Sequence, residues 1–153
     1  KYLKEMGYIQ YEISNFTKKG MECRHNLKYW QNHDYIGVGS GAHSSIDGTR
    51  WANFKSVDRY IDSIGHKGYG IEEKQKTPIE TQRFETIMMG LRLTKGLYKA
   101  QFLKRFGKGI HHYYGEAIRT LKAQGLLLED DGYIYLSQKG MDLQNQVLMY
   151  FLD

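Results

Sequence analysis

The 153-residue chain has little of what several classes of functional site require. Its single cysteine, Cys23, can form no internal disulfide, and one thiolate cannot build a self-contained zinc or iron–sulfur site. No stretch approaches the roughly 18 consecutive apolar residues of a membrane span, and no charged-then-apolar leader opens the chain. The sequence therefore predicts a soluble protein without a membrane span, located in a reducing compartment, the cytoplasm.

The first 66 residues alternate between helix-like and strand-like patterns. Residues 1–6 resemble the last turns of a helix closed by Gly7, and residues 8–13 alternate in polarity as a strand does. Residues 35–39 are predicted to form a second short strand that runs into a glycine turn. A helix is predicted from Ser56, with one apolar face formed by Val57, Tyr60, Ile61 and Ile64. This order indicates an α/β fragment that begins inside a larger helix-and-strand repeat.

Residues 67–76 are polar and contain glycines, so they are predicted to be a linker. The sequence Thr77-Pro78-Ile79-Glu80 then has the N-cap, proline and carboxylate of a helix start. Three short helices ending near Leu91, Gly107 and Gly125 are followed by two strands, 126–129 and 133–136, and a last helix that Ser137 can cap. Residues 77–153 are therefore predicted to form a small α+β, winged-helix-like domain.

A winged helix raises the hypothesis of nucleic-acid binding. The candidate phosphate contacts are the basic residues of this half, Lys104, Arg105, Lys108, Arg119 and Lys122. However, the net charge of +5 is spread over the whole chain, and Asp130 and Asp131 would bring negative charge to the tip of the wing. The preferred interpretation is a solvated helix surface, and no nucleic-acid partner is expected.

The most informative segment is Arg24-His25-Asn26-Leu27-Lys28-Tyr29-Trp30. A neutral imidazole can ligate a metal or haem iron, and aromatic rings can wall a flat macrocycle. If the segment is helical, His25 and Tyr29 share a face, Trp30 lies beside them, and Asn26 can orient a ring or a carboxylate. The alternative is that His25 is a hydrogen-bonded core histidine and that the aromatic rings only pack. His33, His43, His111 and His112 have no comparable neighbours.

A glycine-rich stretch, Gly37-Val38-Gly39-Ser40-Gly41-Ala42-His43-Ser44, follows closely. Glycines after a strand let backbone N–H groups approach a ligand. The spacing is not that of the dinucleotide-binding motif G-x-G-x-x-G, and a turn or bulge explains it equally well.

The order of these pieces resembles a family. The matching segments are Tyr11 to Phe16, the H-N-x-x-Y-W element from His25 to Trp30, Gly37 to Ser44, Asn53, Gly90-Leu91-Arg92, Phe106-Gly107, Leu121, Gly125-Leu126 and Lys139-Gly140. They are similar to the C-terminal portion of the HemW haem chaperones, radical S-adenosylmethionine proteins often labelled as oxygen-independent coproporphyrinogen III oxidase. The resemblance covers essentially the whole chain, and H-N-x-x-Y-W is its most specific element.

For the fold, the resemblance implies that residues 1–66 are the last strands and helices of a partial (β/α) radical SAM barrel. Residues 77–153 correspond to the family's HemN-type C-terminal domain. In the family, a C-x-x-x-C-x-x-C loop holds a [4Fe-4S] cluster with S-adenosylmethionine on its open iron. This chain has no such motif, so by itself it is not expected to perform radical chemistry. Missing barrel neighbours would leave an exposed edge, and homodimerisation or fragment association is expected to follow.

For the site, the resemblance implies that His25 is the axial ligand of haem iron and that Asn26, Tyr29 and Trp30 support it. Gly39, Gly41 and Ala42 match a part of the wall around S-adenosylmethionine. Cys23 is a candidate second haem ligand, although a buried, inert thiol is the preferred interpretation.

For function, the resemblance implies a chaperone that binds haem and delivers it to acceptor proteins. The alternative is a coproporphyrinogen III oxidase of porphyrin biosynthesis, which removes CO2 oxidatively from propionate side chains. The H-N-x-x-Y-W element favours the chaperone.

Overall fold

A computed structural model describes residues 2–152 and divides them into two compact units. One unit combines the chain up to Asn32 with the chain from Arg83 onward, and the other spans His33–Gln82. The boundaries predicted at residues 66 and 77 do not coincide with this grouping. The first 32 residues group with the C-terminal part because residues 11–15 are hydrogen-bonded to the segment after Gly90.

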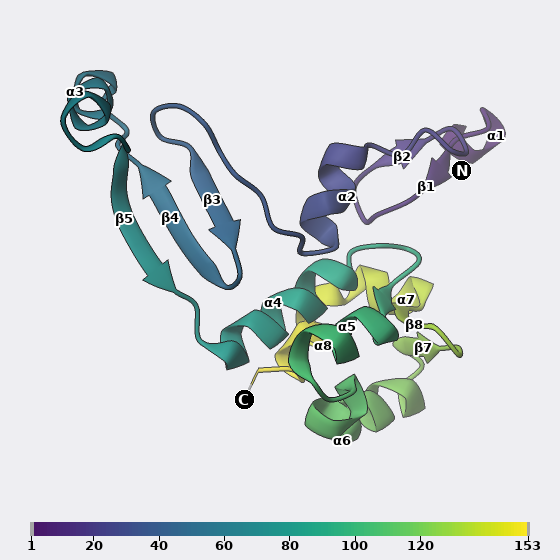
Figure 1. Cartoon of the computed structure of the whole chain (residues 1–153). Helices are drawn as coiled ribbons and strands as arrows, with labels where there is room; N and C mark the ends of the chain where they lie inside the picture. Colours follow the sequence, from purple (N-terminus) through teal and green to yellow (C-terminus); the bar gives the residue numbers. More distant parts are fainter. Residues whose placement is uncertain (1, 153) are drawn as a thin grey trace. The chain divides into compact units, whose positions relative to one another are not determined.

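The unit His33–Gln82 is built on an antiparallel sheet of order β3-β4-β5 (Figure 1). Its strands are β3 His43–Ile46, β4 Thr49–Asn53 and β5 Ile71–Lys76. The predicted linker is therefore wrong over 71–76, which pair with β4. β5 has the sequence Ile-Glu-Glu-Lys-Gln-Lys and lies at a sheet edge, where exposed charged side chains are tolerated and resemble a linker in sequence.

The strand predicted at 35–39 is also wrong. Only Tyr35 makes a bridge, exchanging two backbone hydrogen bonds of 2.9 Å with Ser45. After it, the side chains of Ile36 and Val38 are 68% and 88% exposed. Their apolar character favours a strand, but no neighbouring strand of the described chain covers them.

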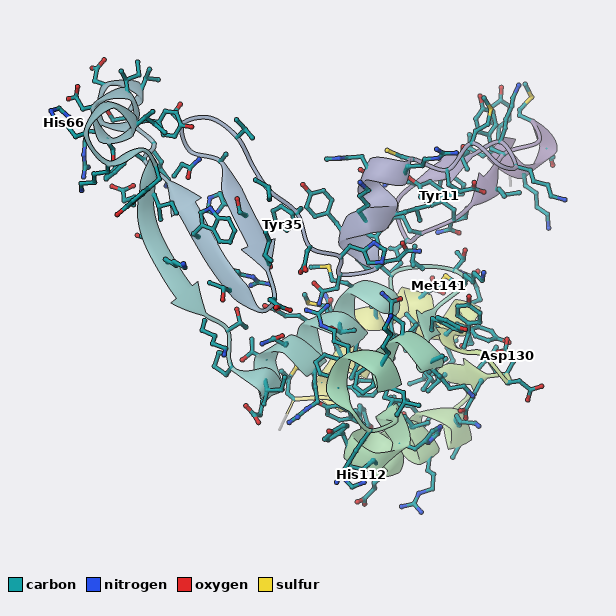
Figure 2. The ribbon with its side chains drawn as sticks, viewed as in Figure 1. Tyr11, Tyr35, His66, His112, Asp130 and Met141 are labelled. Carbon is teal, nitrogen blue, oxygen red and sulfur yellow. The ribbon has the colours of Figure 1, made fainter. Side chains whose placement is uncertain are left out.

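Helix α3, Val57–Lys67, begins at the predicted residue, with the Ser56 hydroxyl accepting a hydrogen bond from the Arg59 N–H. Its apolar face is not buried as predicted, since Val57 and Ile61 are 57% and 60% exposed. The helix instead packs within its unit through Ser63, whose Oγ donates to the Tyr69 carbonyl at 2.9 Å. Figure 2 marks His66 near the end of this helix.

The C-terminal part of the other unit contains the main apolar core. Its elements are α4 Ile79–Gly90, β6 Leu97–Tyr98, α5 Lys99–Phe106, α6 Ile110–Ala123, β7 Leu127–Glu129, β8 Tyr133–Leu136, α7 Gln138–Asp142 and α8 Gln144–Met149. The strands form a sheet of order β6-β8-β7. Buried side chains come from the helices and the sheet, among them Ile87, Phe102, Ile118, Leu121, Ile134 and Phe151. Each contributes about 1.5–3 kcal/mol by leaving water, which makes this part the stable centre of its unit.

The sequence predicted most of this part correctly. Gly107 and Gly125 follow α5 and α6 with positive φ of 75° and 69°, and the hairpin of β7 and β8 is confirmed. The Ser137 hydroxyl accepts a hydrogen bond from the Gly140 N–H, as predicted. The last helix is not continuous, because Leu143, with φ −113° and ψ 24°, separates α7 from α8.

The N-terminal segment of the same unit holds α1 Tyr2–Glu5, β1 Ile9–Gln10, β2 Phe16–Thr17 and α2 Arg24–Trp30. The helix end before Gly7, which has φ 77°, is confirmed. The strand predicted over 8–13 is only two residues long, and the predicted alternation fails because Glu12 is fully buried while Ile9 is 43% exposed. Figure 2 labels Tyr11 in this segment. Among the described residues, no helix combines the length and apolarity needed to cross a membrane.

Candidate functional site

Helix α2 presents the H-N-x-x-Y-W element. It begins after Cys23, whose side chain makes no capping hydrogen bond, although its carbonyl accepts the Leu27 N–H at 3.0 Å. At about 100° per residue, His25 and Tyr29 lie on one side of this helix, and Trp30 lies about 140° around it from His25. The element therefore divides into two sides with different surroundings.

The first side carries a pair of rings. The centroids of His25 and Tyr29 are 5.0 Å apart with an interplanar angle of 78°, which is an edge-to-face contact. His25 is exposed, and Tyr29 retains 38% of its accessible surface. The expectation of a buried thiol next to them is wrong, because Cys23 is exposed and forms no disulfide within the described residues. This side of α2 thus offers an accessible imidazole beside an aromatic ring.

The second side is packed within the same unit. The Arg92 guanidinium carbon lies 4.4 Å from the centroid of the Trp30 ring, a cation–π contact. Trp30 Nε1 is buried, with no hydrogen-bond partner among the described residues. Asn26, one turn before Trp30, is half-buried. The structure brings His25 and Tyr29 together and separates Trp30 from them.

Arg92 also links α2 to a buried carboxylate. Its Nη2 lies 3.0 Å from Glu12 Oε2, and the Glu12 side chain has no exposed surface. The other carboxylate oxygen accepts hydrogen bonds from the Ser14 N–H at 2.9 Å and from Asn15 Nδ2 at 2.6 Å. Glu12, Trp30 and Arg92 come from three separate segments that resemble the family, and sequence reasoning assigned no role to Glu12 or Arg92. The available signal was that each charged residue lies inside a segment that resembles the family: Glu12 in Tyr11 to Phe16, and Arg92 in Gly90-Leu91-Arg92.

Two more contacts fix the end of α2. Asn32 Nδ2 donates to Thr86 Oγ1 of α4 at 2.8 Å, and Arg105 of α5 donates to the Asn32 carbonyl at 2.7 Å. Asn32 has φ 50°, a conformation that asparagine tolerates better than most residues. The orientation of α2 is therefore set by side chains of α4 and α5.

The glycine-rich stretch lies in the other unit, where Gly39 and Gly41 have φ of 104° and 69°. Buried Asn53 holds this loop, donating from Nδ2 to the Gly39 carbonyl and from its backbone N–H to the Ala42 carbonyl, both at 2.9 Å. A Cβ at Gly39 would meet no atom within 4 Å, so the backbone there is open to a ligand. Gly39, Gly41 and Ala42 belong to the unit His33–Gln82, whereas His25 belongs to the other unit.

The described residues do not fit an iron–sulfur cluster. They contain no group of three or more histidine, cysteine, aspartate or glutamate side chains that could hold a metal ion. Haem iron needs fewer protein ligands, since one axial imidazole is sufficient. The exposed His25 fits that demand, and Cys23 lies two residues before it.

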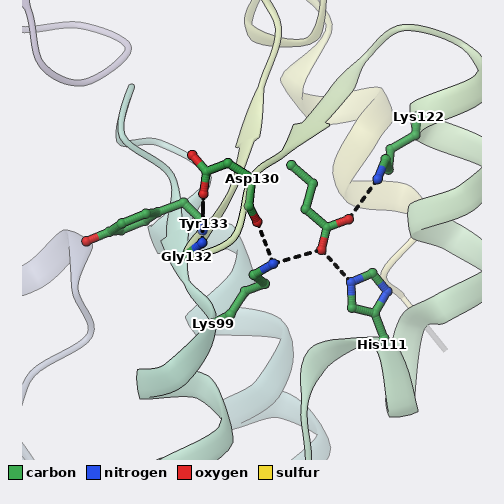
Figure 3. Close-up of polar contacts among 7 residues, drawn as sticks. Lys99, His111, Lys122, Asp130, Gly132 and Tyr133 are labelled. Atoms are coloured by element: carbon green, nitrogen blue, oxygen red, sulfur yellow. Dashed lines mark hydrogen bonds and ion pairs between the residues drawn. The ribbon is translucent and has the colours of Figure 1, made fainter.

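Two of the candidate phosphate contacts, Arg105 and Lys122, make interactions within their own unit. Lys122 Nζ lies 2.7 Å from Glu129 Oε2, and His111 Nε2 and Lys99 Nζ lie 2.6 and 3.1 Å from the other oxygen (Figure 3). Burial raises the pKa of Glu129, but the hydrogen bonds from Lys122, His111 and Lys99 outweigh it and lower the pKa to about 2. Asp130, at the hairpin turn, accepts the Gly132 and Tyr133 N–H groups (Figures 2 and 3).

Comparisons with known proteins identify the relatives of this chain. Residues 78–143 match the model of the HemN C-terminal domain family. The chain is 40% identical over 146 residues to the "Heme chaperone HemW" of Bacillus subtilis and 36% identical over 152 residues to that of Lactococcus lactis. These alignments cover 95% and 98% of this chain but 38% and 39% of the relatives. The chain thus spans about two fifths of their length.

A solved structure shows the same fold. It is described as coproporphyrinogen III oxidase (HemN) from Escherichia coli, a radical SAM enzyme, and it superposes with a TM-score of 0.70 at 18% sequence identity. The match covers 98% of this chain and 38% of that one. The chain belongs to the family of HemW haem chaperones, and its residues 78–143 correspond to a HemN C-terminal domain.

Proposed function

We propose that this chain is the C-terminal part of a haem chaperone and that it binds haem through His25. The observation that carries the proposal is the exposed pair of His25 and Tyr29 on α2, whose opposite side is packed. A free imidazole nitrogen can ligate iron, while the Tyr29 ring offers an apolar surface to the macrocycle. Trp30 acts in this proposal by holding the helix, and Asn26 lies beside it. The named relatives are haem chaperones, which supports the same cargo.

The rest of the proposed centre belongs to the longer protein. We infer that residues 1–66 belong to a radical SAM barrel and that Gly39, Gly41 and Ala42 approach S-adenosylmethionine there. The iron–sulfur cluster would be held by other parts of the protein. The helix, strand, helix, helix, hairpin order from α4 to β8, with sheet order β6-β8-β7, supports a winged-helix-like C-terminal domain. Haem acceptor proteins would be its partners, in the cytoplasm, with a homodimer as one assembly state.

The test is a haemin titration followed by the Soret band. In the full chain, His25→Ala should shift the Soret maximum and weaken binding about ten-fold or more, because an iron–nitrogen bond is lost. His33→Ala is the matched control, since His33 is also exposed, and it should behave as the wild type. An unchanged spectrum and affinity in His25→Ala would remove His25 as the ligand.

The oxidase alternative is decided by turnover. Oxidative decarboxylation of coproporphyrinogen III by the reconstituted, full-length protein would overturn the chaperone proposal. Nucleic-acid binding is disfavoured because Lys122 and Arg105 already make internal contacts and Glu129 adds negative charge near the hairpin. A salt series with duplex DNA should detect no binding near the roughly 10⁻⁶ M expected of a non-specific binder.

A further inference from the structure

A cavity of about 120 Å³ lies within the unit that carries α2. Its apolar surface comes from Leu93, Leu97 and Phe102, the last of which is completely buried. For scale, an engineered apolar cavity of about 150 Å³ holds benzene. The space therefore suits a single ring or a small branched group, and it is far too small for a porphyrin.

Aromatic rings form another part of the wall. Tyr98 and Tyr133 stack with their centroids 5.0 Å apart at 30°, and Trp30 lines the same cavity. The buried Trp30 Nε1 is a hydrogen-bond donor with no acceptor in the described part of the chain. A buried donor left without a partner costs free energy, so a ligand that supplies an acceptor gains from it.

The cavity is also lined by two cationic side chains, Lys95 and Arg105. Lys95 Nζ lies 4.7 Å from the centroid of Tyr133, and a hydrogen bond with Tyr133 raises the pKa of Lys95, which keeps it charged. Arg105 donates to the Asn32 carbonyl and retains further N–H groups. No aspartate or glutamate of the described residues lines the cavity, and neither cation makes an ion pair within residues 2–152.

We propose that this cavity binds a small organic carboxylate with one flat or compact apolar group, either free or at the end of a peptide. The apolar group enters between Trp30 and the Tyr98 and Tyr133 rings, and the carboxylate accepts hydrogen bonds from Lys95 and Arg105. A ligand of this size, held by these two charge-assisted contacts, is expected to bind with a millimolar dissociation constant. This site is independent of haem binding at His25.

The experiment uses the indole N–H signals in a ¹H–¹⁵N spectrum of the full chain. The chain has two tryptophans, so Trp51→Phe, in the other unit, assigns the Trp30 signal. Benzoate and benzyl alcohol share a ring and differ in charge. Benzoate should move the Trp30 signal saturably, and benzyl alcohol should bind at least about five-fold more weakly. An unmoved Trp30 signal, or equal affinity for the two probes, would overturn the proposal.

Two variants show whether benzoate affinity depends on the Lys95 side chain itself or only on the net charge of the protein. Lys95→Gln should weaken benzoate binding about five-fold and leave that of benzyl alcohol unchanged. Lys104→Gln removes the same charge from an exposed position of α5 that does not line the cavity, so benzoate should bind it as it binds the wild type. Equal weakening by the two variants would contradict a carboxylate at Lys95. An N-acetylated peptide ending in phenylalanine, compared with its C-terminal amide, distinguishes a chain terminus from a free acid.

Discussion

Arg92 contacts Glu12 and Trp30 at the same time: its guanidinium pairs with the buried carboxylate at 3.0 Å and covers the indole ring at 4.4 Å. One arginine after α4 therefore joins an N-terminal turn to the helix that presents His25. Because the cation satisfies a fully buried anion, its removal affects both neighbours. The first prediction concerns this residue.

Arg92→Ala should destabilise the unit by about 3 kcal/mol, because it leaves the Glu12 charge buried without its partner. Urea unfolding measures the change, and Arg119→Ala, an exposed position of α6, should change stability by less than about 0.5 kcal/mol. The double variant Glu12→Gln/Arg92→Ala should recover part of the loss. Equal stability of Arg92→Ala and Arg119→Ala would show that the ion pair is not stabilising.

Stability should depend on pH through Glu129. Its pKa of about 2 lies below the ordinary value of 4.5, so the carboxylate stabilises the folded state above about pH 4.5. That contribution, about 3 kcal/mol at neutral pH at 1.36 kcal/mol per pKa unit, is lost as the pH falls through the folded value. Glu129→Gln should therefore be less stable than the wild type at pH 7 and nearly equal to it at pH 2. A difference that stays constant over this range would contradict the shifted pKa.

Alanine substitutions at Gly96 and Gly107 should distinguish the stability cost of a steric clash from that of backbone strain. Both have positive φ, 86° and 75°, but a Cβ at Gly96 would lie 2.2 Å from the Ile134 carbonyl oxygen, while one at Gly107 would meet no atom within 4 Å. Gly107→Ala should cost about 1–2 kcal/mol, the penalty of the left-handed conformation alone. Gly96→Ala should cost at least about 2 kcal/mol more, because the β6–β8 contact must open. Thermal unfolding of the two variants tests this order, and equal losses would refute the clash.

Asn53→Ala should loosen the glycine-rich loop without unfolding its unit. The variant loses the hydrogen bond to the Gly39 carbonyl but keeps the backbone bond to Ala42. Amide exchange at Gly41, whose N–H donates to the Phe54 carbonyl at 2.8 Å, should become about ten-fold faster, as expected for one net hydrogen bond. Exchange in β4 should stay unchanged, and acceleration throughout the sheet would indicate a general loss of stability instead.

Local signals in the sequence predicted the C-terminal part well. The glycines after α5 and α6, the hairpin and the Ser137 cap each depend on a few neighbouring residues, and all are present. The failures occur where distant residues decide the outcome. Glu12 is buried because Arg92, 80 positions away, pairs with it, and Val57 and Ile61 are exposed although they lie on the apolar face of α3.

Part of the geometry of α2 was predictable in the same way. Spacing alone placed His25 and Tyr29 on one side of a helix, and their ring contact agrees with it. Spacing did not show that Trp30 packs under Arg92, because that contact depends on where the chain after α4 returns. The glycine-rich stretch was identified by composition, but its fixing residue, Asn53, was seen only as a match to the family.

The division of the chain has a consequence for synthesis on the ribosome. Residues 33–82 make their sheet from neighbours in sequence, so this insertion can fold as soon as it emerges. Glu12 can form its ion pair only after Arg92 has been translated, 80 residues later, and its carboxylate has no cationic partner during that interval. The segment that presents His25 therefore cannot reach its final orientation until Arg105, which also holds the end of α2, has been translated.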